Sequence, residues 1–312
     1  FSANLLGLDN AATPFGLKAM ESLQELNPKK DSASDAQIMF MVLHASGLTL
    51  IPVSIIAQRL ILKSNNPTEV FIPCLIATFV ATMVAMSVTA LWQRFSLRQW
   101  KSILLFGGIG ALAMAGLGVY LRYYLTNQAA ADFSTIVSNG IIFLLFIVFL
   151  AGGYVKKVPV YDVFIEGARQ GFDVAIKIIP YLVGMLVAIS VLRNCGVFDF
   201  MIQGISAVVG LFNVDTEFVK ALPTALMKPF SGSGSRAMMI DAMKQYGPDS
   251  FVGRLSCVFQ GSADTTFYIV ALYFGSVGIK RVRYAIPAAL LADLAGIITA
   301  IILAYAWPWA LS

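Results

Sequence analysis

Long apolar stretches restrict the fold of this chain more than any other feature. Apolar residues make up 58% of the 312 positions and charged residues 12%, with a mean hydropathy of +0.77. Soluble domains carry roughly 25% charged residues. A helix needs about 20 mainly apolar residues to cross a bilayer. Several stretches reach this length: 36–58, 68–92, 102–124, 134–154, 174–193, 252–276 and 284–306. We therefore predict an all-α, polytopic membrane protein.

Basic residues indicate which loops face the cytoplasm. The net charge is +5, and basic clusters lie in loops 94–101, 155–170 and 278–283. Cytoplasmic loops carry an excess of Lys and Arg, so these three loops should be cytoplasmic. The clusters are short and separated, unlike the continuous basic face of a nucleic-acid-binding protein. We expect a multi-pass protein of the inner (cytoplasmic) membrane with no nucleic-acid partner.

Two parts of the chain resemble one another. At offsets of 220 and then 214 residues, the corresponding pairs include Pro28 and Pro248, His44 and Asp264, Ser46 and Thr266, and Pro73 and Pro287. Counting spans places the loop near Asn65 outside and its duplicate near Lys280 inside. Equivalent loops on opposite faces predict an inverted-topology repeat, as in many transporters.

Two segments of the second half are too short to cross a bilayer. They cover 217–230 and 235–246 and flank the small polar sequence Ser231-Gly-Ser-Gly-Ser235. Irregular backbone at membrane depth is tolerated only against protein or a watery cavity. We therefore predict re-entrant hairpins and broken helices, with the first-half break at Asn4 to Pro14.

The hairpin break supplies the first group of candidate substrate-binding residues: Ser231, Gly232, Ser233, Gly234, Ser235 and Arg236. Hydroxyls, exposed amides and a following helix N-terminus can bind an anion. The alternative is a serine-capped hairpin whose glycines only permit close packing.

A second group interrupts an otherwise apolar helix: Gln260, Ser262, Asp264, Thr265 and Thr266. A carboxylate at the centre of a membrane costs about 2.5–3.5 kcal/mol on insertion scales, so Asp264 should face a cavity or a partner. The alternative is a polar contact that only holds helices together. Asp293 in the last apolar stretch is a further buried-charge candidate.

The first half supplies the third group: Asn4, Asp9, Asn10, Thr13, His44 and Ser46. His44 is the only histidine and corresponds to Asp264, which suggests a substrate donor or a titrating group. The alternatives are a packing histidine and, before Pro14, an ordinary helix cap.

Other site chemistries lack sequence support. Cys74, Cys195 and Cys257 are widely separated and have no zinc-site spacing, so we expect neither a disulfide nor a bound metal. A phosphate-binding loop is also missing. We expect no cofactor and no enzymatic activity.

Several motifs carry a family resemblance. Residues 7–20 resemble A-type spore maturation proteins, and the stretch from Glu166 to Leu294 resembles the B type, most clearly at Pro229-Phe-Ser-Gly-Ser-Gly-Ser235. Both types belong to the nucleoside-recognition or Gate group, whose relatives include concentrative nucleoside transporters. The resemblance implies an A–B fusion, with an A-like half at 1–155 that lacks its N-terminal part and a B-like half at 156–312.

The two polar groups differ from the family pattern. B-type proteins usually have Ser-Thr-Glu-Thr-Thr where this chain has Ser262-Ala-Asp-Thr-Thr266, and A-type proteins usually have Asn-Thr-Ser at 44–46.

These observations favour a small-solute transporter. Its substrate would be a polar or anionic molecule held between the two broken-helix repeats. Expected partners are the small-molecule substrate, a coupling ion that is either H⁺ or Na⁺, and the lipid bilayer, with homo-oligomerisation as a further option. One alternative is a membrane scaffold or sensor that does not transport. Another is an intramembrane serine hydrolase using Ser233 and His44, which would need the two side chains in hydrogen-bond contact.

Overall fold

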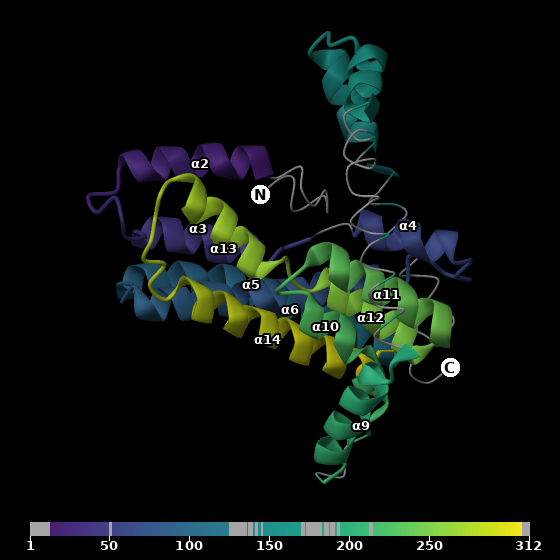
Figure 1. Ribbon diagram of the computed structural model, residues 1–312. Helices are drawn as coiled ribbons and strands as arrows, with labels where there is room; N and C mark the ends of the chain where they lie inside the picture. The colour runs from purple at the N-terminus through teal and green to yellow at the C-terminus, as the bar shows by residue number, and fades with distance from the viewer. Residues whose placement is uncertain are drawn as a thin grey trace.

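The described residues of the computed structural model form a helical protein (Figure 1). They cover 13–49, 52–124, 146–169, 194–211 and 215–307, with a few isolated positions between 136 and 191. The all-α prediction is confirmed for these residues. The named elements are α2 (Thr13–Glu25), α3 (Asp35–Ala45), α4 (Val53–Ile61), α5 (Phe71–Trp92), α6 (Leu97–Tyr124), α9 (Val197–Gly210), the 3₁₀ helix η2 (Glu217–Ala221), α10 (Leu222–Met227), α11 (Gly232–Tyr246), α12 (Phe251–Gly261), α13 (Thr266–Ser276) and α14 (Ala285–Ala306).

Helices α5 and α14 lie side by side at the centre (Figure 1). Each has 22 residues, and among the described residues these two are long and apolar enough to cross a membrane. The C-terminal end of α5 adjoins the start of α14, because the rings of Trp92 and Tyr284 lie 5.3 Å apart. The helices therefore run antiparallel. They pack closely through small side chains, and a Cβ placed on Gly296 would lie 3.4 Å from that of Ala81.

Two stretches that are long enough to span are broken in the structure. The stretch 36–58 divides into α3 and α4, and 252–276 divides into α12 and α13. The first break lies between Ala45 and Val53, where Gly47 adopts a φ of +59° and Pro52 precedes α4. Residues 262–265 form the second break. An 11-residue helix is about 16 Å long, roughly half the hydrocarbon thickness, so no half-helix here could span alone.

The hairpin before α12 differs from the sequence prediction. We expected a flexible tip at Ser231–Ser235, but α11 already begins at Gly232 and the turn lies at 228–231. The reason is local, because the Ser231 hydroxyl accepts a hydrogen bond from the Gly234 amide at 3.0 Å and so caps the helix. The glycines belong to the first helical turn.

The ends of the bundle are closed by loops that are distant in sequence. At one end, the carbonyl of Asp31 accepts hydrogen bonds from the amides of Lys280 and Arg281. At the other end, Asp249 in the α11–α12 loop accepts a hydrogen bond from the amide of Asn65 in the α4–α5 loop. α9 extends away from the bundle (Figure 1). Of the expected spans, 134–154 is described at 146–154, which is helical, and at four isolated positions, whereas 174–193 lies almost entirely outside the described residues.

Candidate functional site

The two helix breaks touch each other at the centre of the molecule. The amide of Asp264 donates a 2.8 Å hydrogen bond to the carbonyl of Ala45, the last residue of α3. Gly47 packs directly against this contact, and a Cβ placed there would lie 3.1 Å from the Asp264 nitrogen. Both the positive φ and this close approach require glycine. The two breaks thus join through a hydrogen bond between backbone groups that have no partner within their own helices.

His44 and Asp264, which the sequence analysis pairs at an offset of 220 residues, also face each other. Nε2 of His44 lies 3.8 Å from a carboxylate oxygen of Asp264. The hydroxyl of Tyr273 lies 3.2 Å from Nδ1 of His44, and its ring meets the imidazole edge-on. The carboxylate of Asp264 is about one third exposed. This arrangement leaves an accessible acidic group beside a largely buried imidazole.

A small cavity lies between the two breaks. Its volume is about 40 Å³, and its wall is formed by Gly47, Thr49, Pro52, Ser54, Ile55, Lys228, Gln260, Gly261, Ala263 and Asp264. Gln260 is 5% exposed, and its side-chain oxygen has no hydrogen-bond partner. A buried amide oxygen without a partner costs about 1–3 kcal/mol, so this group is suited to a ligand or a water molecule. About 10–15 Å³ suffices for one water molecule, and the present cavity is too small for a nucleoside.

The hairpin tip covers the second break. The carbonyl of Pro229 accepts a 2.9 Å hydrogen bond from the amide of Phe267, and the rings of Phe230 and Phe267 stack. A Cβ placed on Gly232 would lie 2.7 Å from the Thr265 hydroxyl. The N-terminal end of α11 therefore lies directly on the break between α12 and α13.

Several predicted binding hydroxyls are hydrogen-bonded within the protein. Ser235 donates to the carbonyl of Thr224, and Ser262 donates to that of Phe259. Ser46 pairs with Thr82 of α5 at 3.1 Å. Thr266 donates to Asp293 of α14 at 2.7 Å. These groups are buried and satisfied, which agrees with the packing alternative for their hydroxyls.

Of the remaining candidate residues, the structure describes some and leaves others outside the described residues. Ser231 caps α11, and its hydroxyl lies 3.3 Å from that of Ser233. Arg236 is half-buried in α11. Asn4, Asp9 and Asn10 lie outside the described residues. Thr13 begins α2, and its side chain is likewise outside the description.

Sequence reasoning missed Lys228 and Thr49, which line the cavity. Lys228 is 8% exposed and immediately precedes Pro229 in an apolar segment. A lysine in such a segment is a functional candidate by default, and this signal could have identified it.

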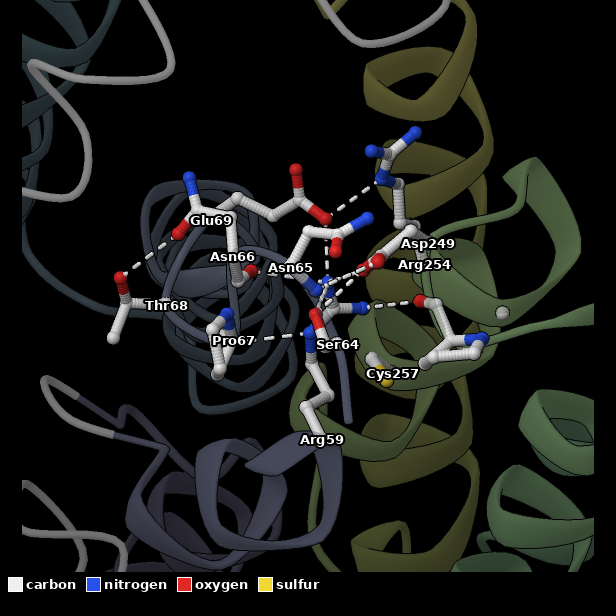
Figure 2. Close-up of polar contacts among 12 residues, drawn as sticks. Arg59, Ser64, Asn65, Asn66, Pro67, Thr68, Glu69, Asp249, Arg254 and Cys257 are labelled. Atoms are coloured by element: carbon white, nitrogen blue, oxygen red, sulfur yellow. Dashed lines mark hydrogen bonds and ion pairs between the residues drawn. The ribbon is translucent and has the colours of Figure 1, made fainter. Parts of the chain in front are cut away.

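Sequence reasoning also missed a buried ion-pair network at one end of the bundle (Figure 2). The Arg59 side chain is 0% exposed and contacts Glu69 and Asp249. It donates to the carbonyl of Pro248 at 2.6 Å, and Arg254 pairs with Glu69 at 2.7 Å. Arg59 stands within an apolar run, which was its only sequence signal. The network links the loop after α4 to the loop before α12 through the contacts of Asp249.

The opposite end is closed by exposed charges. Arg283 pairs with Asp35 at 2.7 Å, with the two side chains 41% and 52% exposed. The hydroxyl of Tyr284 also donates to Asp35. Such solvent-exposed pairs typically contribute about 0–1 kcal/mol. The two ends of the bundle are therefore held with unequal strength.

No metal-binding site is evident in the described part of the chain. Its residues contain no cluster of three His, Cys, Asp or Glu side chains that could hold an ion. Cys74 and Cys257 are buried and free, and Cys195 is exposed and free.

The two long apolar helices, α5 and α14, have the length and composition of helices found in membrane proteins. Comparison with known proteins assigns it more narrowly. Residues 175–280 match the nucleoside-recognition (Gate) family model. The chain is 47% identical over 151 residues to spore maturation protein B of Bacillus subtilis (strain 168), which covers 48% of this chain and 83% of that protein. It is 41% identical over 86 residues to spore maturation protein A of the same organism, covering 28% of this chain and 44% of that protein. The chain belongs to the spore maturation protein group of the Gate family. No solved structure matches it.

Proposed function

We propose that this protein is an inner-membrane permease for a small polar or anionic solute, which binds between the two helix breaks. The observation that carries the proposal is the contact between Ala45 and Asp264, where the breaks border a cavity lined in part by Gln260, whose buried side-chain oxygen has no hydrogen-bond partner. Discontinuous helices at a repeat interface are the usual binding device of secondary transporters. Lys228 adds a cation to the cavity wall, which favours an anionic or strongly polar solute.

The matching lengths and order of two sets of helices support an inverted repeat. The pairs are α2 and α11 with 13 and 15 residues, α3 and α12 with 11 each, α4 and α13 with 9 and 11, and α5 and α14 with 22 each. The last helix of each set starts 214 residues from the other, and the two run antiparallel. In such a pair, rocking of one set against the other would open the cavity alternately to each side.

The small cavity volume fits a closed state of this cycle. About 40 Å³ between the breaks admits water molecules rather than a substrate of nucleoside size. Opening would require the ends of the bundle to separate in turn. The exposed Arg283–Asp35 contact would part more readily than the Arg59 network, so we expect the basic-loop end to open first.

A thermal-shift screen tests the proposal. The purified full chain in detergent would be heated with nucleosides, carboxylates and amino acids in turn. A ligand present at 100 times its dissociation constant stabilises the native state by about 2.7 kcal/mol. We expect at least one class to raise the melting temperature, and Asp264→Asn and Gln260→Ala to lose the rise. Arg283→Ala lies outside the cavity and is the matched control, which should keep it.

Two outcomes contradict the permease. One is the failure of every compound class to shift the wild-type protein, which would favour the scaffold or sensor. The other is an equal shift in the wild type and both cavity variants, which would place the ligand elsewhere.

A further inference from the structure

Asp293 is a buried carboxyl group in the long apolar helix α14. Its side chain is 4% exposed. One carboxyl oxygen accepts the Thr266 hydroxyl at 2.7 Å, whereas the other is buried without a hydrogen-bond partner. Among the described residues, only this atom and the Gln260 oxygen are buried side-chain polar atoms in that condition. A native protein keeps such an atom at a cost in stability, which calls for a functional explanation.

The first half of the chain shows that packing does not require this carboxyl group. There, Ser46 attaches the first break to α5 by pairing its hydroxyl with Thr82. Ser46 corresponds to Thr266 at the offset of 220, and the residue that corresponds to Asp293 at the offset of 214 is Phe79. In the first half, a hydroxyl pair therefore attaches the break to α5, which has no charged side chain at the position that corresponds to Asp293. The second break adds an acid to the same arrangement.

The surroundings of Asp293 couple it to the cavity. Lys228 and Asp264, which both line the cavity, are the charged groups that act on its carboxyl. Behind Asp264 lies the imidazole of His44, 3.8 Å away from that carboxylate. On the other side, the buried face of α5 presents only alanine and threonine side chains around Ala81 and Thr82. Motion of the second break, which contains Asp264, changes the distance from Asp293 to that cavity charge.

We propose that Asp293 is a proton-binding site, whose unpartnered oxygen takes up a proton when the second break closes on α14 and releases it when the break moves away. The Thr266 hydroxyl holds the other oxygen in both states. A proton fits better than a metal cation, because hard cations such as Ca²⁺ take six to eight oxygen ligands and a proton needs only one. The coupling of this proton to solute movement rests on the proposed permease function, whereas the binding of the proton does not.

Infrared titration of the purified full chain tests the proton site without any substrate. The carboxylic-acid C=O band would be followed from acid to alkaline pH in the wild type, in Asp293→Asn and in Asp31→Asn, a control carboxyl that is exposed and lies outside the cavity. The amide oxygen that Asp293→Asn introduces can still accept the Thr266 hydrogen bond, so this variant should fold, and its melting curve verifies this. We expect one component of this band that disappears reversibly as the pH rises, absent from Asp293→Asn and present in Asp31→Asn.

Three results overturn the assignment. Every component of the titrating band could survive in Asp293→Asn, the band could be absent from the wild type, or it could remain at every pH. Sodium chloride provides a separate arm against a choline chloride control of equal ionic strength. A sodium-specific rise in the wild-type melting temperature that Asp293→Asn abolishes would assign the site to Na⁺ instead. A titrating band in a protein that binds no solute would leave the proton site intact and refute the permease.

Discussion

Removal of the Arg59 side chain should be among the most destabilising single changes in this protein. The guanidinium is fully buried and pairs with Glu69 and Asp249, whose side chains are 7% and 23% exposed. Breaking a buried ion pair by removing one partner costs about 3–5 kcal/mol, because a charge is left uncompensated. Glu69 keeps Arg254 and Asp249 retains some solvent. We therefore expect Arg59→Met to cost about 3 kcal/mol, near the low end of that range.

The opposite end of the bundle provides the matched control. Arg283→Met removes an equally short contact to Asp35, but this pair is exposed and should contribute about 0–1 kcal/mol. Denaturant unfolding in detergent, extrapolated linearly, measures both free energies. Salt should distinguish them further, since about 1 M salt shortens the screening length to roughly 3 Å and weakens only exposed pairs. Equal costs for the two variants, or equal loss in salt, would refute the reasoning.

Three more experiments address the breaks, the site and the topology. Gly47→Ala should destabilise the protein by more than about 1 kcal/mol, because the φ of Gly47 is +59° and the new Cβ would press on Asp264. The control is Gly278→Ala, whose φ is a similar +72° but whose new Cβ would enter open space. It should cost less stability in the same unfolding assay. Asp264→Ala should abolish ligand binding in a folded protein, whereas Ser233→Ala should lose only a hydrogen bond worth about 0.5–1.5 kcal/mol; complete loss at Ser233 with turnover of an ester substrate in the wild type would favour the hydrolase instead. Cysteines placed at positions 98 and 281 in a background without native cysteines should resist an impermeant reagent in intact cells, and their labelling would reverse the predicted topology.

The polar interruption around Asp264 could be located from the sequence because its signal is local, whereas the first break, after Ala45, was not predicted. A polar residue within an apolar run, such as Asp264, is costly in a bilayer wherever the rest of the chain lies. The same argument predicted the helical class and the stretches that became α5 and α14. Each of these features depends on the solvent and on a few neighbouring residues, so a linear sequence contains enough information to predict it.

The partners of these polar groups came only from the tertiary structure. The hydroxyls of Ser46 and Thr266 belong to the same kind of motif as the cavity residues, yet they are bound to α5 and α14. Arg59 finds Asp249 at a separation of 190 residues. The contact of Ala45 with Asp264 likewise joins two breaks that are far apart in the chain. Composition and local sequence predicted a helical membrane protein with a polar interruption, whereas long-range packing decided which buried polar atoms have a hydrogen-bond partner and which have none.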